Sequence, residues 1–152
     1  MKLKQVLFPS LFSLVIAGSL SAASQEVKSV TISAFDTIKY SVTKIEAHPG
    51  QKVVVQLKNE GNLPKEAMGH NWILLKLGVD PLAYSIAAIG AKAENYQPKS
   101  HADKVLASIP ILGPKESGKT SFTAPSVPGT YPYVCSFPAH CQAGMRGVLI
   151  VK

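Results

Sequence analysis

The chain has 152 residues, and its 16 Lys and Arg against 9 Asp and Glu give a formal net charge of +7. The basic residues are scattered and form no run longer than two, so the composition argues against a nucleic-acid-binding protein and favours an ordinary solvated surface. The length suits one domain with a single hydrophobic core.

Residues 1–23 are predicted to be a cleaved signal peptide. Lys2 and Lys4 precede a largely apolar stretch over 6–20, and three small residues suited to cleavage follow it. The stretch contains Pro9 and is shorter than the about 20 apolar residues of a membrane span, so we expect cleavage rather than a retained anchor. Residues 24–152 should then form a single soluble domain, exported to the periplasm or secreted, without stable membrane insertion.

The rest of the chain is predicted to be rich in short strands. A helix should begin with Asp80 as its N-cap and Pro81 at its first position, and end before Gly90. The pattern indicates an all-β fold, a Greek-key β-sandwich of antiparallel strands, about seven or eight in number, with one short helical insertion. Alternating, β-branched segments bounded by Gly and Pro give the expected strands: 26–33, 40–47, 52–59, 70–77, 104–109, 119–124, 130–135 and 147–152.

The segment 135–145 carries three soft or borderline metal ligands at even spacing. Four residues separate Cys135 from His140, and four more separate His140 from Met145. Pro138 and Gly144 favour a folded turn here. A thiolate, an imidazole and a weak axial thioether make up the ligand set of a blue-copper centre, provided that a second histidine comes from elsewhere.

His70 is the candidate for that second histidine. It follows Gly69 at the start of the strand expected over 70–77, where Trp72 and Leu74 share its face by the two-residue period. A lone histidine on such a face is more often a core residue. The missing ligand of the 135–145 segment favours a metal ligand instead, while Trp72 is expected to be a core residue.

Both cysteines of the chain lie in the same segment. In an exported protein a disulfide is the default expectation. A bridge between Cys135 and Cys141 would close only a small loop and leave the spacing of His140 and Met145 unexplained. We therefore predict that Cys135 is a metal ligand and that Cys141 is a partly shielded residue near the surface without a role. An intermolecular disulfide or a modification of the Cys141 thiol is the alternative.

These motifs resemble those of the azurins, which are blue (type 1) copper proteins of the cupredoxin family. The resemblance rests on residues 62–65, 68–72 and 135–140 together with Met145, and it extends over most of the chain after residue 23. The gap of four residues before Met145 is more similar to auracyanins and plastocyanins than to azurins, which have three. Azurins also carry a disulfide away from the metal, and no cysteine of this chain can form it.

The resemblance implies one copper ion per chain, cycling between Cu(II) and Cu(I). His70, Cys135 and His140 would be its equatorial ligands and Met145 its weak axial ligand, and the Gly69 backbone carbonyl would be a distant contact on the opposite side. Asn71 would tie the two ligand segments together and place hydrogen bonds around the cysteine sulfur.

Three firm ligands and a weak thioether leave no open position for a substrate, so the site is predicted to be a carrier and not an enzyme. The expected function is to shuttle single electrons, as a monomer, between redox proteins such as a cytochrome or a copper-containing reductase or oxidase. A hydrophobic rim around His140, including Met68, Phe137 and Ala143, would be the docking surface.

Two other copper functions compete with electron transfer as interpretations of these residues. The alternative is a periplasmic copper chaperone or storage protein without redox cycling. A copper oxidase or reductase would need a second copper with further histidines, and His48 and His101 are too few.

Overall fold

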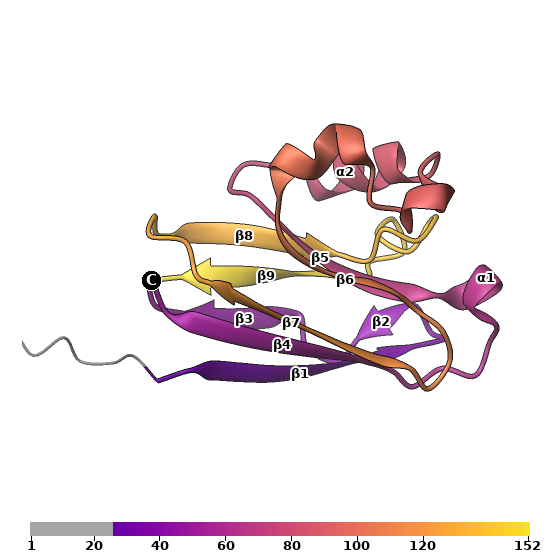
Figure 1. The fold of residues 1–152 in the computed structure, drawn as a ribbon, viewed down its shortest axis with the longest axis horizontal. Coiled ribbons are helices and arrows are strands. Elements are labelled where there is room, and N and C mark those ends of the chain that lie inside the picture. The colour runs from indigo at the N-terminus through magenta and orange to yellow at the C-terminus, as the bar shows by residue number, and fades with distance from the viewer. Residues whose placement is uncertain (1–25) are drawn as a thin grey trace, which may run out of the picture.

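The computed structural model of the chain describes residues 26–152, so the predicted signal peptide lies outside the described residues. Two β-sheets pack face to face, and one helix covers the outer face of one of them (Figure 1). The predicted all-β sandwich is confirmed. Among the described residues, no helix is both long and apolar enough to cross a membrane.

Nine strands and two short helices follow one another within residues 26–152, where about seven or eight strands were predicted. The strands are β1 (Lys28–Phe35), β2 (Lys39–Tyr40), β3 (Lys44–Ala47), β4 (Lys52–Asn59), β5 (His70–Leu75), β6 (Val105–Leu112), β7 (Ser117–Thr123), β8 (Gly129–Val134) and β9 (Arg146–Val151). The helices are α1 (Lys65–Met68) and α2 (Pro81–Ala88), with 3₁₀ turns at Lys92–Glu94 and Lys99–Lys104.

The two sheets are mixed, and this corrects the prediction of antiparallel pairing. One sheet has the order β2-β1-β4-β7 and the other the order β3-β9-β8-β5-β6. The pairs β1–β4 and β3–β9 are parallel, whereas the remaining pairs are antiparallel. The parallel pairs arise because the chain leaves the first sheet after β2, adds β3 to the second sheet, and then returns as β4.

The strand predicted over 40–47 is in fact two strands in different sheets. Tyr40 belongs to β2, which pairs with β1, and Ile45 belongs to β3, which pairs with β9. Both side chains are buried although they are five residues apart. One continuous strand would place residues at this odd spacing on opposite faces, so the chain must bend between them.

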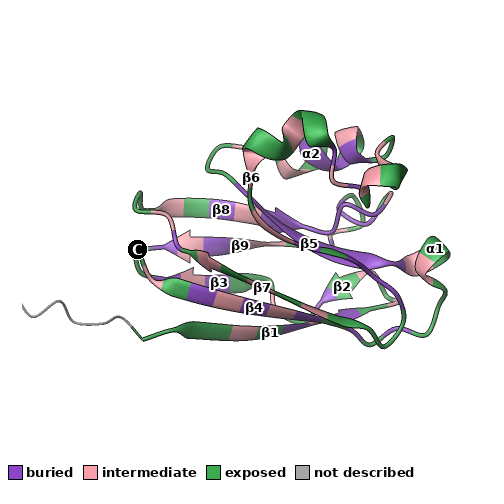
Figure 2. Ribbon diagram, viewed as in Figure 1, coloured by how far each residue is buried: buried purple, intermediate pink, exposed green. Residues whose placement is uncertain are grey.

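Strand β5 is buried along its whole length, which fixes the first part of the predicted site (Figure 2). Trp72 and Leu74 face the main core between the sheets, on the face that the sequence predicted. Ile73 and Leu75 face outward into a smaller apolar cluster, which Tyr84 of α2 covers. Packing on both faces therefore holds the strand that begins with His70.

The predicted helical insertion is confirmed as α2. Asp80 is its N-cap, and the Asp80 carboxylate accepts a hydrogen bond from the Leu82 N–H at 2.8 Å. Helix α1 was not predicted, because a single turn of four residues is too short to show a helical period.

A glycine of β9 allows the close approach of two strands behind the predicted site. Gly147 pairs with Tyr133 of β8. A Cβ at Gly147 would lie 2.3 Å from the Tyr133 ring and 2.5 Å from the backbone oxygen of Thr43.

We therefore expect Gly147→Ala to lower the free energy of unfolding by about 2–3 kcal/mol, because a backbone atom and a buried ring must shift. Urea unfolding of the variant measures this. Gly90→Ala is the matched control, since a Cβ there meets no atom within 4 Å. Equal losses of stability in the two variants would contradict the close-packing argument.

Candidate metal centre

Three metal-binding side chains come together at one end of the sandwich. His70 is the first residue of β5, Cys135 follows β8 directly, and His140 lies in the turn after Cys135. Their ligand atoms all lie within 4.8 Å of one another. The exposed fractions are 0% for His70 and Cys135 and 3% for His140. The structure thus brings together the three residues predicted as equatorial ligands.

The donor atoms fit a metal ion with soft and imidazole ligands. The Cys135 sulfur lies 3.4 Å from Nδ1 of His140, and the two imidazole rings are 5.0 Å apart at an angle of 41°. Both ring nitrogens of His70 are buried without a hydrogen-bond partner. Buried polar atoms of this kind need a partner, and a bound metal ion would supply one for the ring nitrogen that coordinates it. A thiolate with two imidazoles is the donor set that suits copper.

The protonation of the two histidines favours metal binding. Burial, and to a smaller extent the neighbouring His70, lowers the pKa of His140 to about 4, and burial also lowers the pKa of His70. Both imidazoles are therefore neutral near pH 7, with a lone pair free to bind a metal.

Burial and hydrogen bonding shift the pKa of the Cys135 thiol in opposite directions. Burial raises its pKa to about 12. Hydrogen bonds from the backbone N–H groups of Asn71 and Phe137, and from the Tyr40 hydroxyl, act in the other direction because they stabilise the thiolate. Metal binding must release the thiol proton, and these donors prepare the site for the anion that results.

The turn between His140 and Met145 is closed by its own hydrogen bonds. The Met145 N–H donates to the His140 carbonyl at 2.9 Å, and the Gly144 N–H donates to the Cys141 carbonyl at 3.0 Å. This pair of bonds is a Schellman motif, which needs a left-handed residue at its end. Gly144 supplies that conformation with a φ of 95°. On the outside of the turn, Nζ of Lys39 donates to the Ala143 carbonyl at 3.1 Å.

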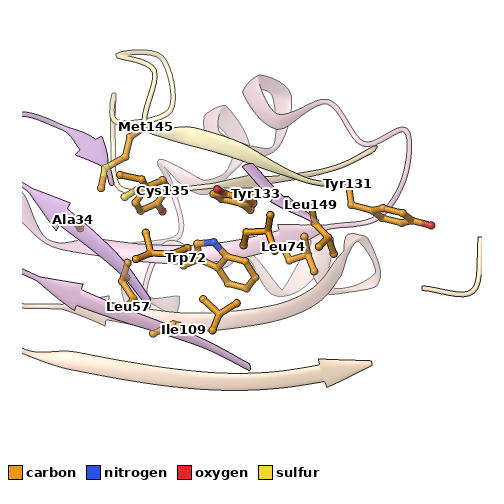
Figure 3. Packing of buried hydrophobic residues seen from close by; sticks show 14 of the residues in the cluster. Ala34, Leu57, Trp72, Leu74, Ile109, Tyr131, Tyr133, Cys135, Met145 and Leu149 are labelled. Atoms are coloured by element: carbon orange, nitrogen blue, oxygen red, sulfur yellow. The ribbon is translucent and has the colours of Figure 1, made fainter. Parts of the chain in front are cut away.

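The turn brings the chain back so that Met145 lies next to Cys135. The Cys135 N–H donates to the Met145 carbonyl at 3.0 Å, and the Met145 side chain is fully buried. Figure 3 shows both residues at one end of the core, with Trp72 and Tyr133 further along it. Met145 therefore lies near the three donors, while its role as axial ligand stays a prediction.

Gly69 has a packing reason to be glycine. A Cβ at this position would lie 2.6 Å from the Lys65 backbone oxygen and 2.7 Å from the Ile111 side chain. Helix α1 and strand β6 thus approach the backbone closely, directly before His70. The contact predicted for the Gly69 carbonyl with the metal stays a prediction.

Asn71 joins the two ligand segments, as predicted. Its side-chain oxygen accepts a hydrogen bond from the Ser136 N–H, and its amide nitrogen donates to the Ser136 hydroxyl, both at 2.8 Å. The Ser136 hydroxyl in turn donates to the Tyr96 carbonyl at 2.5 Å. The residues after His70 and Cys135 are therefore fixed to one another, and through Tyr96 to the segment after α2.

Two predictions about the turn need correction. Phe137 is only 8% exposed and lies under His140, with ring centroids 4.7 Å apart, so it supports the ligand instead of forming an exposed rim. Met68 is half-buried and Ala143 is exposed. Cys141 is fully buried under α2, where its sulfur lies 3.6 Å from the Pro81 carbonyl, and it is not near the surface. That burial argues against the alternative of a reactive thiol.

Both cysteines are free, so the rejected Cys135–Cys141 disulfide is absent. His48 and His101, which the sequence assigned no metal role, lie away from the three donors: the His48 ring contacts the Lys152 carbonyl, and the His101 ring contacts the Ser100 hydroxyl.

No sequence pattern indicated that Tyr40 belongs to the site. Its hydroxyl donates to the Asn71 carbonyl, 31 positions further along the chain. Ser136 was not predicted as a site residue either, although its position directly after Cys135 could have suggested such a role.

Comparison with known proteins agrees with this donor set. The family described as copper binding proteins, plastocyanin/azurin family, matches residues 26–152. An azurin of Pseudomonas fluorescens biotype C is 34% identical over 127 residues, covering 81% of this chain and 97% of that protein. Auracyanin-B of Chloroflexus aurantiacus is 33% identical over 121 residues, covering 76% of this chain but 48% of that protein.

Solved structures show the same similarity. The dithionite-reduced auracyanin of Roseiflexus castenholzii has a TM-score of 0.73 and 31% identity, covering 82% of this chain and 97% of that one. An azurin of Methylomonas sp. strain J has a TM-score of 0.71 and 30% identity, covering 82% and 98%.

The lowered pKa of His140 predicts a pH-dependent stability for the protein prepared without metal. An unfolded histidine binds a proton near pH 6.5, but the folded one does so only near pH 4. Between these values the unfolded state holds more protons, so stability is present above pH 6.5 and falls as the pH is lowered to 4, by up to about 3 kcal/mol. Urea unfolding at several pH values measures this loss. The variant His140→Gln should show a smaller loss, and an identical pH dependence in both proteins would contradict the assignment.

Proposed function

Since the chain belongs to the plastocyanin/azurin family of copper-binding proteins, we propose that it carries single electrons between redox proteins outside the cytoplasm. One observation carries this proposal: three buried donors within 4.8 Å of one another, on two segments that Asn71 holds together. Copper bound there would supply the one-electron couple of Cu(II) and Cu(I).

The protein contributes rigid placement of the donors. His70 is fixed by strand β5, which is buried on both faces, and His140 is fixed by the Schellman turn and the Phe137 ring. Donors held in this way move little when the charge of the site changes, which favours fast electron exchange.

Burial supports a carrier over an enzyme. A catalytic metal site keeps a position open for water or substrate. Here the least buried donor, His140, is only 3% exposed, so a partner can reach the edge of an imidazole but a substrate cannot reach the donors. The exposed Ala143 and the half-buried Met68 would form part of the docking surface around that edge.

The sequence supports the proposed export and an acidic partner. Without Lys2 and Lys4, the 16 basic residues become 14 against 9 acidic ones, a net charge of about +5. A periplasmic or secreted protein with this charge is suited to an acidic redox partner, such as a cytochrome or a copper-containing reductase or oxidase. We expect it to act as a monomer.

The proposal predicts a coloured protein. Addition of Cu(II) to the purified chain should produce an intense thiolate-to-copper band in the visible spectrum, which bleaches with reductant and returns with oxidant. Cys135→Ser should abolish the band, because it removes the thiolate. Cys141→Ser is the matched control and should keep the band, since Cys141 lies under α2.

A colourless copper complex, or one that binds Cu(I) without cycling, would overturn electron transfer and favour the copper chaperone or storage function. Loss of the band in Cys141→Ser alone would show that the ligand assignment is wrong.

The docking surface is tested separately. Ala143→Glu should slow electron transfer to a partner by about tenfold, because a charge at the rim must be desolvated, while the copper spectrum stays unchanged. Val127→Glu is the control. Val127 is 56% exposed and lies before β8, at the end of that strand opposite to Cys135. Equal rates in the two variants would remove Ala143 from the docking surface.

A further inference from the structure

The two-residue strand β2 reaches both ligand segments from the opposite sheet. Within residues 26–152 it pairs only with the end of β1, at Ala34↔Tyr40 and Phe35↔Lys39. Lys39 contacts the turn after His140 through the Ala143 carbonyl, and Tyr40 contacts the residue after His70 through the Asn71 carbonyl. A strand of two residues contributes little to the pairing of the sheet. Its two long-range hydrogen bonds therefore indicate that these residues have another role.

The Asn71 carbonyl lies where the sheet is interrupted. His70 pairs with Leu112 and Trp72 pairs with Ile109, with a register shift between these pairs. Pro110, in the extra length of β6, has no N–H to donate. A buried carbonyl at such a point needs a donor from outside the ladder, and the Tyr40 hydroxyl is that donor.

Tyr40 and Cys135 belong to the same buried cluster, and a hydrogen bond from the Tyr40 side chain acts to lower the pKa of the Cys135 thiol. Tyr40 is 6% exposed, and its ring packs against Tyr133 with centroids 5.9 Å apart, so the hydroxyl has no freedom to turn to solvent. A phenol hydroxyl has one proton to donate. It is therefore shared between the Asn71 carbonyl and the sulfur of the predicted ligand.

We propose that Tyr40 is a positioning residue of the metal centre, whose hydroxyl orients Asn71 and adds a third hydrogen bond to the Cys135 thiolate beside the two backbone N–H groups. The expected effect of Tyr40 on the reduction potential rests on the proposed electron-transfer function. A donor to the sulfur stabilises the added negative charge of the reduced site, and so Tyr40 raises the reduction potential.

The test is Tyr40→Phe, which keeps the ring and removes only the hydroxyl. In the copper-loaded protein, the equilibrium constant for reduction by a one-electron donor should fall about fivefold, which is the size of one net hydrogen bond. The energy of the thiolate-to-copper band should also shift. In the protein prepared without metal, the carbon-13 NMR shift of the Asn71 carbonyl should change, because its hydrogen bond is lost.

Tyr133→Phe is the matched control. Tyr133 is fully buried next to Tyr40, and its hydroxyl also donates to a backbone carbonyl, that of Val42 at 2.7 Å, which belongs to neither ligand segment. This variant should lose stability to a similar degree but keep the wild-type potential and the Asn71 carbonyl shift.

An unchanged Asn71 carbonyl shift in Tyr40→Phe would overturn the inference, whether or not copper cycles. An unchanged potential, or equal changes of potential in the two variants, would overturn it in a protein that does cycle. If the wild-type protein fails to cycle at all, the electron-transfer proposal falls, and the carbonyl shift alone decides the positioning role.

Discussion

The reciprocal hydrogen bonds between Asn71 and Ser136 are the constraint on which the site depends. They connect two segments that are 65 residues apart, directly after His70 and directly after Cys135. Neither segment could hold a metal alone, because each supplies only part of the donor set. The two packed sheets bring the segments close, and the side-chain amide fixes their relative position with both of its polar groups. The fold thus brings the two ligand segments near each other, and Asn71 fixes their exact relative position.

The donor residues could be predicted from the sequence because metal chemistry is carried by residue type and spacing. Cys135 and His140 share one turn, and His70 stands at the start of a recognisable strand. The parallel pairing of the sheets could not be predicted, since it depends on where the chain crosses between them. The burial of Cys141 was missed for a related reason: it results from the packing of α2, and no local pattern records which residues a helix will cover.

The role of Tyr40 was also impossible to predict from a local sequence pattern. Its partner is a backbone carbonyl, which every residue carries, and the need for a donor arises only from the interrupted pairing of β5 with β6. The odd spacing of two buried residues, Tyr40 and Ile45, did contain the information that the chain bends between β2 and β3. Hydrophobic periodicity therefore located the strands well, but it left the polar contacts between them unassigned.

Because β5 is buried on both faces, the segment that carries His70 should open less often than the turn that carries His140. Segments covered on both sides exchange their amide hydrogens slowly, whereas turns held by local hydrogen bonds open more often. His70 begins the first kind of segment and His140 lies in the second. Transient opening should therefore release the imidazole of the turn while the upstream imidazole stays in place. A metal ion would enter and leave through this motion of the turn, and the donor at the start of β5 would persist throughout.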